Sequence, residues 1–148
     1  MIRGIHAKYV LDASVAAKWF TRHDEGEREK AIALRALHQE GRCKLVVPEF
    51  SLLEILNAVR FSKRAEEVDA THAIDLLERL RLEVVHLDWE LLRKANTIAW
   101  AYQVALYDAA YVALAEHQGF PFLTADEVLV KKLQGHSIVI RLRDVDFS

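Results

Sequence analysis

The 148-residue sequence has one cysteine, two prolines, five glycines and no long hydrophobic run. The single Cys43 excludes an internal disulfide and a cysteine-based zinc site, and it is typical of a reducing compartment. Charged residues interrupt every apolar stretch well short of the roughly 20 apolar residues that a membrane-spanning helix needs. The segment from Met1 to His6 has neither the long apolar stretch nor the cleavage site of a signal peptide. We therefore expect a cytoplasmic protein.

Other chemical signatures are also missing. The seven histidines include no HxxxH or HExxH pair, which disfavours a zinc hydrolase of that type. The sequence contains neither the glycine-rich P-loop motif nor the glycine-rich dinucleotide-binding motif. The net charge of −2 argues against a globally basic nucleic-acid binder, although it does not exclude a local basic patch.

What the sequence does contain is enough apolar material for a normal core. Hydrophobic residues make up 52% of the chain, so disorder is not expected. At this length we expect one domain over residues 1–148.

Short runs rich in Val, Ile and Leu alternate with longer helical patterns. The predicted strands are Lys8–Leu11, Leu45–Val47, Glu83–Leu87, Pro121–Leu123 and Ile138–Leu142. The predicted helices are Val15–Phe20, Glu25–Glu40, Phe50–Phe61, Glu66–Leu80, Trp89–Tyr102, Asp108–Gln118 and Glu127–Leu133. This alternation predicts an α/β fold with a mainly parallel sheet, whose sites form beyond the carboxyl ends of the strands.

Four acidic residues have positions that suit such a site: Asp12, Glu54, Asp108 and Asp126. Each follows an apolar, strand-like run or lies in a helix that follows one. If the strands are parallel, the four carboxylates can converge at one end of the sheet. Four negative charges repel one another strongly without a cation, so the arrangement predicts a site for a hard metal ion.

A simpler interpretation exists for three of the acids. Aspartate is a preferred N-cap residue, so Asp12, Asp108 and Asp126 could each cap a helix. Glu54 is different, because it and Asn57 lie on neighbouring turns and point away from the main apolar face of their helix. The alternative for Glu54 is a solvated surface side chain.

Four segments carry a family resemblance: Tyr9–Ser14, Pro48–Ala58, Tyr107–Ala115 and Leu123–Asp126. Together, and in this order, they resemble the PIN domain, with the closest likeness to VapC-type toxins of prokaryotic toxin–antitoxin pairs. The resemblance extends over essentially the whole chain.

The resemblance implies a parallel five-stranded sheet of order 3-2-1-4-5 flanked by helices, and a magnesium- or manganese-dependent endoribonuclease. The family's acidic positions carry over to the four acids, and its supporting polar positions to Ser14, Asn57 and Thr124. The resemblance also implies a homodimer and a cognate antitoxin whose C-terminal segment occupies the active-site groove. We expect Asp12 and Asp126 as the most direct metal ligands, Asp108 sharing the metal, and Glu54 orienting or deprotonating the attacking water, directly or as a second ligand.

RNA also has to be held near the acids. Lys18 and Arg22 lie on or just after the helix that follows Asp12, and Lys63 and Arg64 end the helix that carries Glu54. These four cations are candidates for phosphate contacts, with plain solvation as the alternative.

Rival classes fit less well. A haloacid-dehalogenase-type phosphatase normally has a second acid where this chain has Ser14, and a receiver domain needs an acidic pair near the first strand. The remaining alternative is a catalytically inactive PIN-like module that binds RNA or protein.

Overall fold

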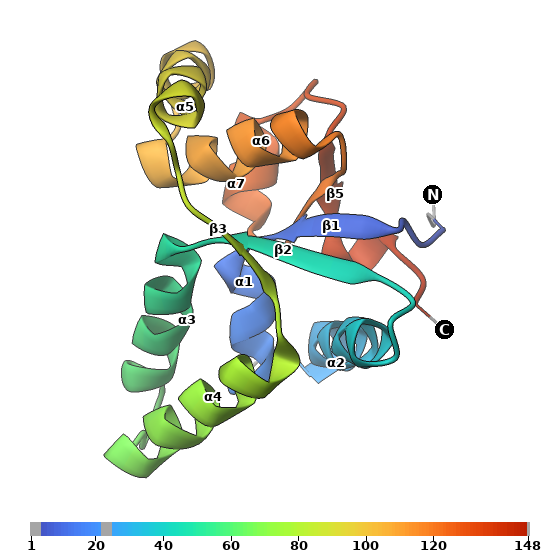
Figure 1. Ribbon diagram of the computed structural model, residues 1–148, viewed down its shortest axis with the longest axis vertical. Helices are drawn as coiled ribbons and strands as arrows, with labels where there is room; N and C mark the ends of the chain where they lie inside the picture. The colour runs from blue at the N-terminus through green and yellow to red at the C-terminus, as the bar shows by residue number, and fades with distance from the viewer. Residues whose placement is uncertain (1–3, 22–24, 148) are drawn as a thin grey trace.

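The computed structural model describes residues 4–21 and 25–147, and strands and helices alternate along them (Figure 1). The strands are β1 (Lys8–Leu11), β2 (Lys44–Pro48), β3 (Glu83–Val85), β4 (Phe122–Thr124) and β5 (Val139–Arg141). The α-helices are α1 (Ala13–Ala16), α2 (Glu25–Gln39), α3 (Phe50–Arg60), α4 (Glu67–Leu80), α5 (Trp89–Tyr102), α6 (Leu106–Gln118) and α7 (Glu127–Lys132). Two 3-10 turns, η1 (Ala17–Trp19) and η2 (Leu142–Asp144), complete the described elements.

The five strands form one sheet in the order β3-β2-β1-β4-β5, and every neighbouring pair is parallel. This confirms the predicted fold class and strand order. β1 lies at the centre, with Leu11 opposite Leu123 of β4. The carboxyl ends of these two strands are therefore adjacent, and the chain continues from them to Asp12 and to Asp126.

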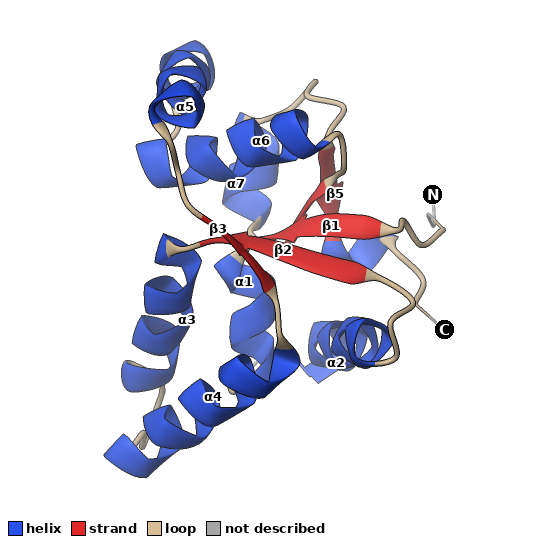
Figure 2. Ribbon diagram, in the orientation of Figure 1, coloured by secondary structure: helices blue, strands red, loops and turns tan. Residues whose placement is uncertain are grey.

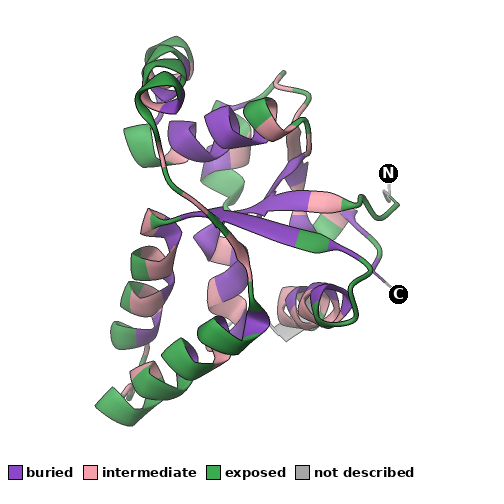
Figure 3. Cartoon of the chain, in the orientation of Figure 1, coloured by how far each residue is buried: buried purple, intermediate pink, exposed green. Residues whose placement is uncertain are grey.

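Helices cover both faces of the sheet (Figure 2). Successive residues of a strand point to opposite faces, and β1 supplies both cores in this way. Tyr9 and Leu11 pack in a core with α1, α2, α3 and α4, whereas Val10 packs in a second core with α5, α6 and α7. Figure 3 shows the buried sheet between these two layers. No helix within the described ranges has the length and apolar character needed to cross a bilayer.

Several element boundaries differ from the predicted ones. The expected strand Pro121–Leu123 lies at Phe122–Thr124, because proline has no N–H for the ladder and Pro121 contributes its carbonyl to Val10 instead. The third strand ends at Val85 rather than Leu87, and the last strand ends at Arg141, where the chain turns into η2. The helix expected over Val15–Phe20 begins at Ala13 and tightens into η1.

Helix α5 has an N-cap made by a side chain. Asp88 lies just before it, and its Oδ1 accepts a hydrogen bond of 2.8 Å from the Leu91 N–H. Asparagine caps helices about as well as aspartate does. An Asp88→Asn variant therefore removes one exposed acid while keeping a cap, which makes it a matched control for charge changes at the four acids.

Candidate active site

The four predicted acids come from four separate segments and meet at the carboxyl end of the sheet. Asp12 joins β1 to α1, Glu54 lies in α3, Asp108 lies in the first turn of α6, and Asp126 joins β4 to α7. Their charges act on one another: those of Asp12, Asp126 and Glu54 all raise the pKa of Asp108. The structure thus brings together all four side chains that the sequence singled out.

Asp12 is buried, and two hydroxyl groups hold its carboxylate. Its Oδ2 accepts hydrogen bonds from Thr124 Oγ1 at 2.6 Å and from Ser14 Oγ at 2.8 Å. Burial raises the pKa of the Asp12 carboxyl; these hydrogen bonds oppose the rise, while the charge of Asp126 adds to it. Asp12 stands at the N-cap of α1 but makes no capping bond with its side chain, so capping does not explain it.

The same two hydroxyls are themselves fixed by backbone N–H groups. Ser14 Oγ accepts from the Ala125 N–H at 3.0 Å, and Thr124 Oγ1 accepts from the Asp126 N–H at 3.0 Å. The turn after β1 is therefore tied to the turn after β4. The predicted supporting roles of Ser14 and Thr124 have this geometric basis, since each orients the Asp12 carboxylate.

Glu54 faces the other acids from α3. Its Oε1 accepts a hydrogen bond of 2.6 Å from the Tyr111 hydroxyl on α6. Burial raises the pKa of the Glu54 carboxyl, the Tyr111 bond partly offsets this, and the nearby Asp12 charge raises the pKa further. The alternative of a freely solvated surface glutamate is therefore wrong.

The Asp108 carboxyl is also perturbed. Burial is the largest cause, the charges of Asp12, Asp126 and Glu54 add to it, and together they raise its pKa to about 6. Helix α6 begins at Leu106, two residues before the predicted start, and Ala105 is its N-cap. The capping interpretation is therefore wrong for Asp108, which instead lies within the first turn, where the helix dipole favours a negative charge.

Asp126 is the one acid of the four whose side chain does cap a helix. Its Oδ1 accepts from the Leu129 N–H at 3.1 Å at the start of α7. The cap fixes the direction of the carboxylate, and the charge still acts on Asp12 and Asp108. Capping and membership of the acidic cluster are thus compatible here.

The donor set fits a hard divalent cation, because carboxylate oxygens are the ligands that Mg²⁺ and Mn²⁺ prefer. Among the described residues, no three His, Cys, Asp or Glu side chains are arranged to hold one ion by themselves. Mg²⁺ typically takes one or two direct carboxylates and keeps several of its waters. The arrangement therefore suits an ion that some of the acids reach through water.

The other predicted residues are more dispersed. Asn57 is exposed one turn after Glu54, and none of the described side-chain contacts joins it to the acids. Lys18 is largely buried, with its Nζ 3.5 Å from Glu27 Oε2, and Arg22 lies outside the described residues.

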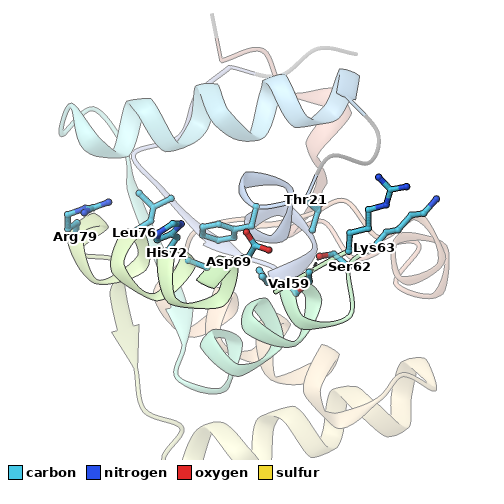
Figure 4. A pocket seen from close by; sticks show the side chains of 12 residues that line it. Thr21, Val59, Ser62, Lys63, Asp69, His72, Leu76 and Arg79 are labelled. Carbon is cyan, nitrogen blue, oxygen red and sulfur yellow. Dashed lines mark hydrogen bonds between the residues drawn. The ribbon is translucent and has the colours of Figure 1, made fainter. Parts of the chain in front are cut away.

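Lys63 and Arg64 are exposed and line a cavity of about 920 Å³ beside α4 (Figure 4). His72 and Arg79 also line this cavity, whereas none of the four acids does.

One residue of the site, Tyr111, is not among the candidates that the sequence suggests. Burial of Tyr111 is complete, but its hydroxyl reaches Glu54. The available signal was spacing, since Tyr111 follows Asp108 by three residues and so lies on the same face of α6.

Comparison with known proteins identifies the family. A family model described as the PIN domain matches residues 9–133. Ribonuclease VapC3 of Pyrobaculum aerophilum is 33% identical over 129 residues, which cover 84% of this chain and 94% of that protein.

Two solved structures share the fold at low sequence identity. A chain of a toxin–antitoxin complex from Klebsiella pneumoniae superposes with a TM-score of 0.67 at 11% identity, over 90% of this chain and 97% of that one. A chain of VapBC2 from Rickettsia felis, bound to a DNA fragment from their promoter, gives a TM-score of 0.66 at 14% identity, over 90% of this chain and 98% of that one. The family match spans most of the sequence, and the strand order of the sheet agrees with it. The chain belongs to the PIN domain family.

Proposed function

We propose that this chain is a metal-dependent endoribonuclease and the toxin of a toxin–antitoxin pair. The observation that carries the proposal is that Asp12, Glu54, Asp108 and Asp126 come from four separate segments to the carboxyl end of the sheet. Burial, and then the charges of the other three acids, raise the pKa of Asp108 there. Strongly perturbed carboxyls gathered from separate elements are typical of a functional site. A relative at 33% identity is named a ribonuclease, and structural neighbours come from toxin–antitoxin complexes.

Phosphodiester hydrolysis needs a nucleophile at neutral pH and stabilisation of charge on the phosphate oxygens. A bound Mg²⁺ or Mn²⁺ supplies both, by acidifying water and by offsetting the developing negative charge. In this proposal Asp12 and Asp126 hold the ion most directly and Asp108 shares it. Thr124 and Ser14 keep the Asp12 carboxylate in place through the 2.6 and 2.8 Å bonds to Oδ2.

Glu54 is the residue that orients the attacking water or accepts its proton, directly or as a second ligand. Tyr111 occupies Oε1 at 2.6 Å, so Oε2 is the oxygen left for this task. The pKa of Glu54 is raised toward neutral pH. A carboxylate is a better general base when its pKa lies closer to the pH at which the enzyme works.

The proposal includes partners. We propose a cytoplasmic homodimer held inactive by a cognate antitoxin. Exposed apolar side chains adjoin the acids in sequence: Leu53 precedes Glu54 at 69% exposure, and Tyr107 precedes Asp108 at 62%. Large exposed apolar side chains such as these are available for contact with a protein partner.

Metal removal tests the proposed activity. The purified chain, freed of any partner, is incubated with total RNA in Mg²⁺, in Mn²⁺ and after chelation, and new RNA ends are sequenced. We expect discrete cleavage sites in either metal, a fall of about 100-fold or more on chelation, and recovery when metal is returned. The Asp88→Asn variant should behave as the wild type.

RNA that is retained by the protein but not cut at any metal concentration would contradict the enzymatic proposal. It would favour the alternative of an inactive PIN-like binding module.

A further inference from the structure

Tyr111 makes contacts that link three elements of the active site. Its hydroxyl donates to Glu54 Oε1 at 2.6 Å and accepts from the Ala13 N–H at 3.3 Å. Glu54 belongs to α3, and Ala13 is the residue directly after Asp12. One oxygen atom on α6 therefore connects the helix that carries Glu54 to the strand end that carries Asp12.

The direction of these bonds is fixed by chemistry. A backbone N–H can only donate, so Ala13 occupies a lone pair of the phenol oxygen and the phenol proton goes to the carboxylate. Burial raises the pKa of the Tyr111 hydroxyl far above its usual range, so it stays protonated and remains a donor. A short bond from a neutral hydroxyl to a carboxylate is among the stronger hydrogen bonds in proteins.

The ring of Tyr111 has little freedom to move. It stacks on Phe122 of β4 with ring centres 5.3 Å apart, and it meets Phe50 of α3 edge to face at the same distance. No part of Tyr111 is exposed. A tightly packed interior restricts side chains to one arrangement. The ring therefore holds the Tyr111 hydroxyl in one position relative to Glu54.

We propose that Tyr111 is a positioning residue of the active site, which holds the Glu54 carboxylate in one orientation relative to Asp12. This rests on the proposed ribonuclease function, in which Glu54 acts on the attacking water. With Oε1 held, the carboxylate cannot rotate freely, and Oε2 keeps one direction. Tyr111 touches neither substrate nor metal in this role and acts through Glu54.

Tyr9 provides a matched control for the loss of a buried tyrosine hydroxyl. Tyr9 is also fully buried, and its hydroxyl accepts a hydrogen bond of 2.9 Å from the His6 N–H near the amino end of β1. Tyr111→Phe and Tyr9→Phe each remove one hydroxyl and keep the ring. A role in packing alone predicts similar kinetic effects for the two variants.

The kinetic test compares kcat and KM for one short RNA substrate in saturating Mg²⁺. We expect Tyr111→Phe to lower kcat about 10- to 100-fold, because a misplaced catalytic group costs about that much, with KM changed less than about 3-fold. Tyr9→Phe should keep kcat within about 2-fold of the wild type. Equal kcat values for the two variants, or an effect of Tyr111→Phe on KM alone, would overturn the proposal.

A second measurement does not depend on cleavage. The unfolding temperature is measured without metal for the wild type, Tyr111→Phe, Glu54→Ala and the double variant. If the hydroxyl acts on Glu54, Tyr111→Phe lowers the unfolding temperature less in the Glu54→Ala background than in the wild type. Additive shifts would show that the two residues do not interact and would overturn the inference. If the wild type cuts no RNA but the changes in unfolding temperature are not additive, the proposed ribonuclease function is rejected and the Tyr111–Glu54 interaction is retained.

Discussion

Asp12→Asn lowers RNA cleavage by about 100- to 1,000-fold and leaves the protein folded, because it removes one charge and almost no volume. An asparagine carbonyl oxygen can still accept the hydrogen bonds that Ser14 and Thr124 now give to Oδ2. The negative charge that would hold the ion is lost. Since Asp12 is buried and burial raises its pKa, removing the charge relieves a cost to the folded state. We therefore expect the metal-free variant to unfold at the same temperature as the wild type or higher.

The measurement combines single-turnover cleavage with thermal unfolding. Asp88→Asn serves as the control, since it also replaces an N-cap aspartate, but at α5. Full cleavage by purified Asp12→Asn in Mg²⁺ would contradict the mechanism. Loss of cleavage together with a large fall in unfolding temperature would assign Asp12 a structural role instead.

The metal-free protein is expected to lose stability through Asp108 as the pH rises from about 4 to about 6. The pKa of Asp108 is raised from 3.8 to about 6 in the folded protein, whereas an unfolded chain returns the carboxyl to its ordinary value. Between these values the folded state keeps a proton that the unfolded state has lost, so each increase in pH favours unfolding. Asp12 and Glu54 act in the same direction, because their pKa values are raised as well.

Other groups titrate in the same range, so the prediction concerns a difference between two proteins. Asp144, for example, has a lowered pKa because of its hydrogen bond with Arg141, and it stabilises the fold as pH rises. Urea unfolding of wild type and Asp108→Asn, both in chelator, isolates the contribution of Asp108. The wild type should lose stability relative to the variant across this window, and added Mg²⁺ at neutral pH should restore it by binding the folded state. A relative gain for the wild type would show that the Asp108 carboxyl is not perturbed as described.

Much of the fold could be predicted because the sequence alternates short β-rich runs with helical patterns. Parallel strands place their carboxyl ends at one edge, so residues after β1 and β4 were expected to meet there, and Asp12 and Asp126 do lie at that edge. The strand order followed from the family resemblance rather than from the periodicity, which indicated only a mainly parallel sheet.

The parts that could not be predicted depend on side-chain contacts between elements distant in sequence. Whether an aspartate caps a helix or receives hydroxyl bonds is decided by its neighbours in space, which is why Asp126 caps and Asp12 does not. Lys18 was a candidate for RNA contact, but the structure places its amine beside Glu27 of α2. Tyr111 resembled a core residue because it is one, and its hydroxyl could be assigned a role only once α3 had been placed next to α6.

Direct binding of Mn²⁺ tests the central claim, that Asp12, Asp108 and Asp126 hold a divalent cation at the carboxyl end of the sheet. The titration is followed by calorimetry near neutral pH for the wild type, Asp12→Asn, Asp108→Asn and Asp88→Asn. We predict that the wild type and Asp88→Asn bind alike, and that the dissociation constant rises about 10-fold or more in each of the other two variants. Equal Mn²⁺ affinity in all four proteins would contradict the assignment of the metal site to these acids.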